Sequence, residues 1–329
     1  MIGKNDLISA IQNLPSIQQG LDAVEKLMLM QAEDYHPDLK SALSVILSSG
    51  GKRIRPTIIL LIGSMLNARV DLIIPLAASI ELLHTATLVH DDLIDGAILR
   101  RGIPTLNSKW SPAATVLTGD FVFASAAELA TKTKSIEVME IFSRTLMTIV
   151  NGEVNQLFNS RCSIDLDDYY RRIYAKTASL FETSTHTAAI LSGVDDQKVE
   201  LLRKFGYEVG MSFQIVDDIL DYAGDQSTIG KPVGGDLKQG LVTLPLLYYI
   251  QDNPTDKSVI SLKEGRCIQE DAEIARLVLA VNSSQALAKA QSDADRFVER
   301  AEKFLNEFPE SLERTALTEI TRYIVERRK

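Results

Sequence analysis

The chain has 329 residues, with 35 Lys and Arg against 44 Asp and Glu, so its formal net charge is −9. Hydrophobic residues make up 45% and charged residues 24%, which is ordinary for a globular protein and excludes a disordered or fibrous chain. An acidic molecule lacks the cationic excess that nucleic-acid binding needs, so we expect no nucleic-acid partner. Any anionic ligand must be held by a local cluster of basic side chains.

Apolar residues recur at spacings of three and four through nearly the whole chain, and no run of strict alternation stands out. This periodicity is typical of α-helices and predicts an all-α fold. Glycines and prolines stand between the helical segments, for example at residues 50–51, 102–104 and 111–112. No linker or shift in composition divides the chain, so we predict a single helical domain over residues 1–329.

The two cysteines, Cys162 and Cys267, lie outside any CxxC pair, so we expect no disulfide framework and no zinc site. A reducing, cytoplasmic location follows from the same reasoning. The N-terminal residues lack the layout of a secretory signal. Apolar runs such as residues 57–62 are shorter than the roughly 18 residues needed to cross a bilayer. We therefore expect no transmembrane segment, while peripheral contact with a membrane surface stays open.

A basic cluster follows the two glycines at residues 50–51, where we expect a helix to begin. Lys52, Arg53 and Arg55 stand within four residues of one another. The unpaired N–H groups of a helix start and the guanidinium groups together form a good cradle for a diphosphate. The segment predicts an anion site, although each cation taken alone is as compatible with a solvated surface.

Residues 81–95 place three aspartates within five positions of an apolar helix. Asp91 and Asp95 are one turn apart and share a face, Asp92 points about 100° away, and His84 lies two turns before Asp91 on the same side. These acids repel one another unless a cation neutralises them. Carboxylates without cysteine partners suit Mg²⁺, which keeps several waters and completes its shell with phosphate oxygens.

Two cationic segments follow this acidic helix along the chain. Arg100 and Arg101 come five and six residues after Asp95, close enough to serve the same site. Further on, Lys176 stands beside the hydroxyl of Thr177. Each segment could contact an anion held by a metal at the acidic cluster.

A second copy of the acidic pattern occurs at residues 213–221. Gln214, Asp217 and Asp221 fall at positions i, i+3 and i+7 and share one side of a helix, with Asp218 next to them. The alternative, that these acids are helix caps and surface ion pairs, is disfavoured because apolar residues flank both copies. We expect the two clusters to face each other and to hold a diphosphate through metal ions.

A glycine-rich stretch, residues 224–240, follows the second acidic cluster. It resembles a P-loop only superficially, because five residues instead of four separate Gly224 from Gly230 and Pro232 stands where Ser or Thr would bind the metal. We interpret the stretch as a flap that carries Lys231.

Together these motifs, in order from about residue 45 to residue 245, closely resemble the trans-prenyl diphosphate synthases. The resemblance implies an all-α isoprenoid-synthase bundle around a central cavity, usually a homodimer. It implies Mg²⁺ as cofactor, and isopentenyl diphosphate and an allylic diphosphate as substrates. In such enzymes the allylic diphosphate ionises, isopentenyl diphosphate attacks the cation, and loss of a proton gives a longer trans product joined 1'-4, head to tail.

The resemblance also implies a role for each predicted site residue. The catalytic side chains are Asp91, Asp92, Asp95, Asp217, Asp218 and Lys176, and among them Asp91, Asp95 and Asp217 hold the metal. The allylic diphosphate contacts Arg100, Lys176, Thr177, Gln214 and Lys231. Isopentenyl diphosphate contacts Lys52, Arg53, Arg55, His84 and Arg101.

Product length in this family depends on the side chains below the first acidic cluster. Ala86 and Thr87, five and four residues before Asp91, are small, and no residues are inserted within the motif. This favours a medium or long product, such as a quinone side-chain precursor, with a short farnesyl or geranylgeranyl product as the alternative. One departure from the family is Leu241, where a Lys commonly follows the glycine, and it puts flap closure in question.

Three other classes of protein share parts of the pattern. A terpene cyclase uses the same fold, but it normally lacks a basic site such as residues 52–55. A non-catalytic partner subunit often loses aspartates from one motif, whereas both are intact here. A phosphohydrolase of the HD type needs further histidines at matching spacing, and the chain has only four histidines in all.

Overall fold

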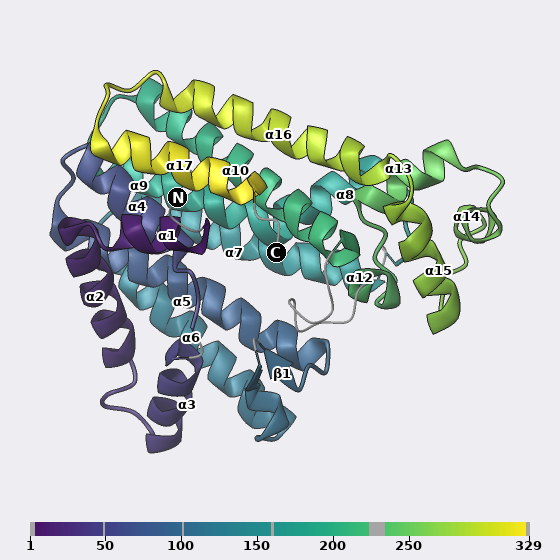
Figure 1. Cartoon of the computed structure of the whole chain (residues 1–329). Coiled ribbons are helices and arrows are strands. Elements are labelled where there is room, and N and C mark those ends of the chain that lie inside the picture. Colours follow the sequence, from purple (N-terminus) through teal and green to yellow (C-terminus); the bar gives the residue numbers. More distant parts are fainter. Residues whose placement is uncertain (1–3, 49, 101, 159–160, 224–233, 327–329) are drawn as a thin grey trace. The chain divides into compact units, whose positions relative to one another are not determined.

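The computed structural model describes residues 4–48, 50–100, 102–158, 161–223 and 234–326, and these residues are almost entirely helical (Figure 1). The first half contains α1 (Lys4–Gln12), α2 (Pro15–Met30), α3 (Pro37–Ser48), α4 (Ile54–Met65), α5 (Val70–Ile94), β1 (Leu99–Arg100), β2 (Ile103–Pro104), η1 (Leu106–Ser108), α6 (Pro112–Thr131) and α7 (Ile136–Phe158). The second half contains α8 (Leu166–Ile173), η2 (Tyr174–Ala178), α9 (Ser179–Leu191), α10 (Asp196–Ala223), α12 (Gly235–Lys238), α13 (Leu244–Asp252), α14 (Lys257–Lys263), α15 (Asp271–Asn282), α16 (Ala286–Leu305) and α17 (Leu312–Glu326). The predicted all-α class is confirmed.

The chain divides into two compact units. Unit 1 consists of Met1–Arg144, Thr183–Arg203 and Phe308–Glu319, and unit 2 of Thr145–Glu182, Lys204–Glu307 and Ile320–Lys329. The first acidic cluster belongs to unit 1 and the second to unit 2. The single domain over residues 1–329 stays a prediction.

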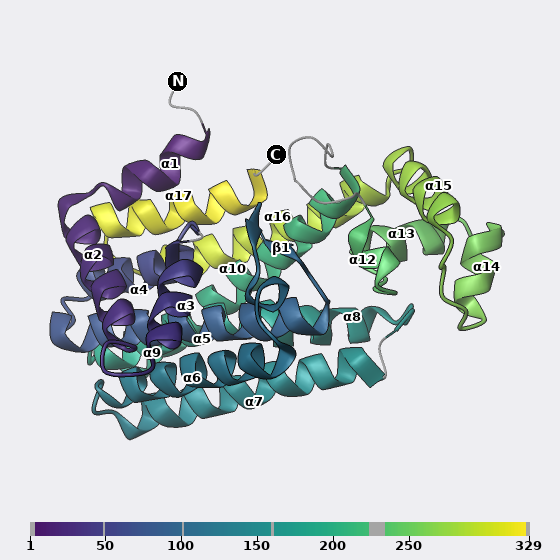
Figure 2. The ribbon, with the colours of Figure 1, turned by 90° about the horizontal axis from the view of Figure 1, so that it is seen from below.

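The core of unit 1 is built on α5 and α6, which run side by side (Figures 1 and 2). Small side chains permit this close packing, and the hydroxyl of Ser79 donates to the carbonyl oxygen of Ala126 at 2.7 Å. By length and composition alone, α5 and α6 are the described helices that could span a membrane. Two thirds of the apolar part of α5 is buried in the protein, as expected of a core helix.

A short hairpin leads away from the end of α5. Strand β1 pairs antiparallel with β2, with Arg100 opposite Ile103, and Gly102 between the strands has a φ of 76° that favours glycine. The sequence analysis did not predict these strands, because two residues per strand are too few to show an alternating pattern.

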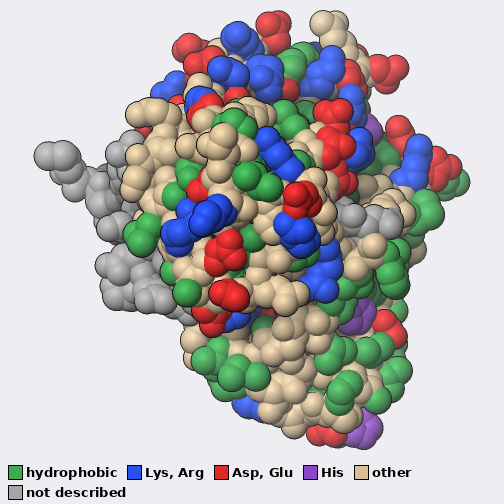
Figure 3. Space-filling view, turned by 90° about the vertical axis from the view of Figure 1, so that its right-hand side faces the viewer, with side chains coloured by type: hydrophobic (Ala, Val, Ile, Leu, Met, Phe, Trp, Pro, Cys, Tyr) green, Lys and Arg blue, Asp and Glu red, His purple; other side chains and the backbone are tan. Residues whose placement is uncertain are grey.

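The core of unit 2 gathers apolar side chains from α8, α10, α13, α15 and α16. Among its fully buried members, Tyr169 and Tyr222 have the largest side chains. Exposed ion pairs such as Lys238 with Asp271, 2.8 Å apart, lie outside this core. Figure 3 shows one face of the molecule on which basic and acidic side chains are interspersed in this way. Because exposed pairs contribute little free energy, the buried side chains account for most of the stability of the unit.

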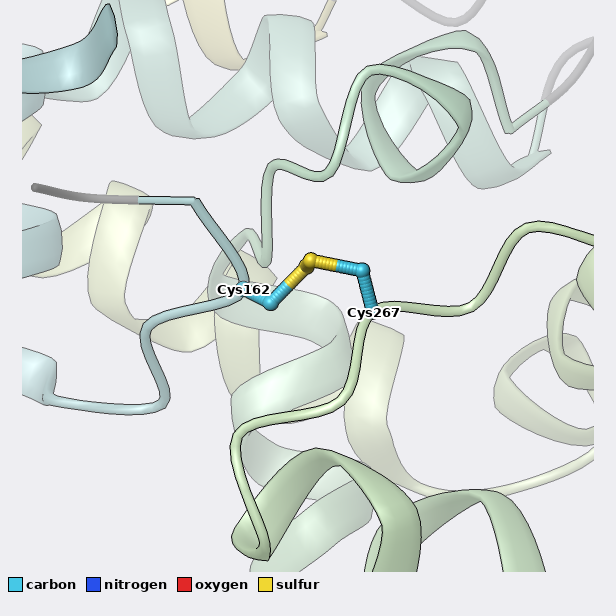
Figure 4. The surroundings of a disulfide bond; sticks show 2 residues. All are labelled: Cys162 and Cys267. Carbon is cyan, nitrogen blue, oxygen red and sulfur yellow. A yellow bond between two sulfur atoms is a disulfide. The ribbon is translucent and has the colours of Figure 1, made fainter. Parts of the chain in front are cut away.

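A disulfide joins Cys162 to Cys267 within unit 2 (Figure 4). Their Cα atoms are 5.4 Å apart although 105 residues separate them along the chain, and the bond ties the segment before α8 to the segment before α15. The backbone N–H of Cys162 also donates to the carbonyl oxygen of Gly240 at 2.7 Å. The expectation of no disulfide was therefore wrong, because only the tertiary fold brings these distant residues together.

Candidate active site

The first acidic cluster lies at the C-terminal end of α5. Asp91 and Asp92 occupy the last turn, and Asp95 is the C-cap, with its backbone N–H donating to the carbonyl oxygen of Asp91 at 2.8 Å. A helix C-terminus carries a partial negative charge, so carboxylates there are destabilised unless cations lie nearby. No basic residue occurs in that last turn. The sequence thus concentrates negative charge where a metal cation would relieve it.

Arg100 supplies one such cation to the cluster. Its Nε lies 2.8 Å from Oδ1 and 3.0 Å from Oδ2 of Asp92, whose side chain is buried. The guanidinium therefore neutralises the aspartate that points away from Asp91 and Asp95, and it fastens the hairpin to the end of α5. Asp91 and Asp95 stand nearer to solvent, on the face that the i, i+4 spacing assigns to them.

The basic cluster of residues 52–55 stands where α4 begins, as the sequence analysis predicts. Arg53 is the N-cap of α4, with a left-handed φ of 44°. Its Nη1 lies 2.7 Å from Oε1 of Glu81, and its Nη2 donates to the carbonyl oxygen of Leu47 at 2.7 Å. These bonds connect α3, α4 and α5, so Arg53 holds these three helices together next to the basic cluster. Its contact with isopentenyl diphosphate stays a prediction.

The other predicted isopentenyl diphosphate contacts lie in the same unit. Lys52 is exposed, and its carbonyl oxygen accepts a hydrogen bond from Nε2 of Gln12 at 2.7 Å. The side chain of Arg55 is buried in the first turn of α4, and His84 is half-buried on α5. Arg101 lies outside the described residues.

The predicted chain-length positions lie inside α5. Ala86 is fully buried, and the hydroxyl of Thr87 donates to the carbonyl oxygen of His84 at 2.7 Å. Both side chains are small, and the hydroxyl of Thr87 is satisfied within its own helix. Their role in product length stays a prediction.

The second acidic cluster occupies the last two turns of α10 in unit 2. Asp217 and Asp221 are half-buried, whereas Asp218 is only 2% exposed. As at the end of α5, no basic residue stands in the last turn. Both acidic patterns therefore lie at the negative ends of long helices, which is a surrounding that favours a bound cation.

Asp218 is the fixed centre of this second cluster. Its Oδ1 accepts from Nε2 of Gln214 at 2.8 Å, and its Oδ2 accepts from the hydroxyl of Tyr169 at 2.8 Å. Burial, together with the nearby carboxylate of Asp236, raises the pKa of Asp218 well above its usual range, and the two hydrogen bonds oppose that rise. A carboxylate in this environment ionises more readily when a cation lies close to it.

The segment that begins at residue 234 returns to the same cluster. Oδ1 of Asp221 accepts from the backbone N–H of Gly235 at 3.2 Å, and Oδ2 accepts from that of Asp236 at 3.3 Å. The first turn of α12 is thus held against the end of α10. Lys231 and most of the predicted flap lie outside the described residues, and so does any closing movement.

Lys176 and Thr177 belong to a single π-helical turn, η2, between α8 and α9. Nζ of Lys176 lies 2.7 Å from Oε1 of Glu153 on α7. The hydroxyl of Thr177 donates to Oε1 of Gln214 on α10 at 2.6 Å. The structure thus brings together three residues that the sequence analysis assigns to the allylic diphosphate. Such π-turns occur frequently at functional sites.

Two glycines allow η2 to pack this closely against its neighbours. A Cβ on Gly152 of α7 would lie 2.6 Å from Cβ of Ala175, and one on Gly210 of α10 would lie 2.5 Å from Cα of Ala178. Real carbon atoms do not approach so closely, so only glycine fits at either position. Glu153, next to Gly152, can then reach Lys176, and Gln214, one turn after Gly210, can reach Thr177.

The described residues contain no cluster of three or more His, Cys, Asp or Glu side chains arranged as a ready metal cage. Mg²⁺ typically binds to one or two carboxylates and completes its shell with water and substrate phosphate. The two acidic clusters belong to different units, and their facing each other across a cavity stays a prediction.

Sequence reasoning missed two residues that contact the predicted site. Tyr169 reaches Asp218 from α8, and Glu153 reaches Lys176 from α7. Neither lies in a motif, and each contact joins residues far apart along the chain. Tyr169 stands seven residues before Lys176, and this two-turn spacing along helical segments is the one signal that the sequence offers.

The polyprenyl synthetase family model matches residues 36–281. The chain belongs to the polyprenyl synthetase family. It is 36% identical over 313 residues to heptaprenyl diphosphate synthase component 2 of Bacillus subtilis, covering 95% of this chain and 89% of the relative. It is 35% identical over 288 residues to octaprenyl diphosphate synthase of Escherichia coli, covering 86% of this chain and 88% of the relative.

Solved structures agree with this assignment. Heptaprenyl diphosphate synthase from Staphylococcus aureus has a TM-score of 0.89 at 31% identity, covering 95% of this chain and 98% of that chain. A polyprenyl synthase from Caulobacter crescentus CB15, complexed with calcium and isoprenyl diphosphate, has a TM-score of 0.89 at 34% identity, covering 98% of both chains. The predicted isoprenoid-synthase fold and prenyltransferase class are confirmed, and the family uses a divalent metal.

Proposed function

We propose that this prenyltransferase condenses isopentenyl diphosphate with an allylic diphosphate and, with Mg²⁺, makes a medium- or long-chain polyprenyl diphosphate. The observation that carries the proposal is the repeated acidic pattern at the C-terminal ends of α5 and α10. In each unit a hydrogen-bonded or ion-paired aspartate, Asp92 or Asp218, lies beside aspartates nearer to solvent. This arrangement suits the capture of a metal-bound diphosphate.

The donor set fits Mg²⁺ because it consists of carboxylate oxygens. Asp91 and Asp95 of unit 1 and Asp217 of unit 2 would hold the metal. Bound Mg²⁺ would supply Lewis-acid stabilisation of the negative charge that develops on the departing diphosphate. Asp92 and Asp218 act through their partners, since each is buried and already hydrogen-bonded.

The basic and polar residues of the site orient the substrates. Lys176 and Thr177 present an ammonium and a hydroxyl from adjacent positions of η2, and Gln214 fixes the hydroxyl. Cations placed where negative charge grows in the transition state speed ionisation more than they tighten ground-state binding. A second diphosphate would bind at residues 52–55, and a terpene cyclase normally lacks such a site.

Product length is the finer part of the proposal. The small side chains of Ala86 and Thr87 favour extension beyond farnesyl length. The relatives named heptaprenyl and octaprenyl synthases support the same assignment. Purified chain incubated with Mg²⁺, isopentenyl diphosphate and farnesyl diphosphate should yield products of more than about 20 carbons by chromatography. Product that stops at farnesyl or geranylgeranyl diphosphate in excess isopentenyl diphosphate would refute the assignment.

A homodimer is also part of the proposal, and α7 offers a surface for it. Met147, Val150, Val154, Leu157 and Phe158 recur at helical spacing, and all are exposed. Within residues 147–158 the one charged residue is Glu153, which is paired with Lys176. A neutral apolar stripe can meet its own copy without repulsion between like charges.

Light scattering tests the dimer with one variant and one control. Val154→Asp should shift the measured mass from about twice the chain mass to the chain mass. Leu279→Asp changes another exposed apolar residue, on α15, and should leave the dimer intact. A wild-type monomer that gains activity only with a second, different chain would support a partner-subunit enzyme instead, as the name "component 2" suggests for the Bacillus relative. A cytoplasmic location stays part of the proposal, although the disulfide between Cys162 and Cys267 removes the cysteine argument for it.

A further inference from the structure

A tyrosine outside every motif contacts the second acidic cluster. Tyr169 lies on α8 and is 1% exposed. Its hydroxyl donates to Oδ2 of Asp218 at 2.8 Å. The hydroxyl of Tyr169 is thus buried and hydrogen-bonded to an aspartate of the proposed site.

The hydrogen bonds around Asp218 form one directed network. The hydroxyl of Thr177 donates to Oε1 of Gln214, the amide of Gln214 donates to Oδ1 of Asp218, and Tyr169 donates to the remaining oxygen. Each oxygen of the carboxylate thus accepts a hydrogen bond from a different side chain. Because every bond leads toward Asp218, its orientation determines where Gln214 and Thr177 can present their polar atoms.

Tyr169 is itself held rigidly from one side. The guanidinium of Arg172, one turn further along α8, lies over the tyrosine ring at 5.6 Å from the ring centre. Arg172 is buried, and its Nη2 donates to the carbonyl oxygen of Val242 at 2.6 Å. A side chain packed between a helix and a fixed guanidinium has little freedom to move, so its hydroxyl is a fixed donor.

The adjacent tyrosine shows the ordinary alternative. Tyr170 lies on the same helix, but its hydroxyl reaches Oδ2 of Asp293 on α16 at 3.5 Å, away from both acidic motifs. Tyr170 therefore serves the packing of unit 2. Tyr169 differs from it in ending on an aspartate of the proposed site.

We propose that Tyr169 is a positioning residue of this enzyme: its hydroxyl orients Asp218, and through it Gln214 and Thr177, toward a metal-bound diphosphate. The inference rests on the proposed function, since it assigns the second cluster to the diphosphate. Tyr169 does not touch the substrate. Its removal should weaken the diphosphate site and leave the site for isopentenyl diphosphate in unit 1 unchanged.

Calorimetric titration tests the inference with Mg²⁺ and inorganic pyrophosphate as the probe. Tyr169→Phe removes one hydroxyl and keeps the ring, and it should raise the dissociation constant of Mg²⁺-pyrophosphate about tenfold, the typical effect of losing a hydrogen bond to a carboxylate. Tyr170→Phe is the matched control and should change that constant by less than about twofold. Wild-type binding by Tyr169→Phe, or equal losses in both variants, would overturn the inference.

Kinetics separate a positioning role from a structural one. In Tyr169→Phe, kcat/KM for the allylic diphosphate should fall about tenfold, while KM for isopentenyl diphosphate should stay within about twofold of the wild-type value. A purely structural role would lower the melting temperature and leave kcat/KM for the allylic diphosphate unchanged. A Tyr169→Phe chain without a cooperative melt would also overturn the inference, because the hydroxyl would then serve the fold alone.

Failure of the inference can be told apart from failure of the proposed function. If the wild-type chain elongates prenyl diphosphates and Tyr169→Phe behaves like it, only the positioning role is refuted. If the wild-type chain forms no prenyl product under the same conditions, the proposed function fails, and the calorimetric comparison still reports on Tyr169.

Discussion

Gly210→Ala is the substitution that tests most sharply how η2 is held against α10. A Cβ at this position would lie 2.5 Å from Cα of Ala178 and 3.0 Å from Cβ of Phe181. Carbon atoms in contact lie about 3.5–4.0 Å apart, so the two backbones must separate by roughly 1 Å. The bond from Thr177 to Gln214, now 2.6 Å, would then lengthen to about 3.6 Å and be lost.

We expect Gly210→Ala to lower both the free energy of unfolding and kcat, with the larger effect on kcat. Overpacking costs about 1–3 kcal/mol, and the better helix propensity of alanine returns about 1 kcal/mol, so the net loss of stability should be about 1 kcal/mol. That corresponds to a fall in melting temperature of roughly 2–4 °C. Displacing Lys176 and Thr177 by about 1 Å should lower kcat about 100-fold.

Steady-state kinetics and thermal melting measure both parts. Gly20→Ala is the control, because its Cβ would meet only the flexible end of Leu60, at 2.9 Å. It should leave kcat within about twofold of wild type. Wild-type kcat in Gly210→Ala would refute the reasoning, since it would mean that the spacing of η2 and α10 does not determine the geometry of the site.

Three further predictions concern stability. Arg100→Ala removes the partner of buried Asp92 and should lower the free energy of unfolding by about 2 kcal/mol in chemical denaturation; an unchanged midpoint would contradict the pairing. The hydrogen bond from Arg276 is the largest cause that lowers the pKa of Asp256 from its usual 3.8 to about 2. This stabilisation is present above pH 4 and lost as pH falls from about 4 to 2. In thermal melts across this range, Arg276→Gln should reduce the loss of unfolding free energy between pH 4 and pH 2 by about 1 kcal/mol. Cys267→Ser opens the disulfide and should cost about 3 kcal/mol relative to the oxidised wild type, with no difference once both are fully reduced.

Local patterns in the sequence predicted the parts of the site that depend on one helix. The i, i+4 spacing placed Asp91 and Asp95 on one face and Asp92 on another, and the structure buries Asp92 while leaving the other two nearer to solvent. The two glycines before Lys52 correctly marked the start of α4. Both inferences need only the geometry of an isolated helix, which the sequence determines.

Features that depend on distant parts of the chain could not be predicted in the same way. The disulfide joins residues 105 positions apart, and the bond from Tyr169 to Asp218 spans 49. The guanidinium nitrogens of Arg53 also contact Glu81 and Leu47, which its place in the basic cluster did not indicate. Such contacts arise from tertiary packing, on which neither residue spacing nor composition carries information.

The central claim is that the acidic clusters of α5 and α10 act on one Mg²⁺-dependent condensation. The most direct measurement is the rate of pyrophosphate release, together with the amount released per isopentenyl diphosphate consumed, compared among wild type, Asp91→Asn and Asp217→Asn at saturating Mg²⁺. The account predicts one pyrophosphate per condensation in wild type. In each variant the rate of pyrophosphate release should be at least 100-fold lower, with both variants melting cooperatively. A wild-type rate in either variant would contradict the claim that both clusters serve the same reaction.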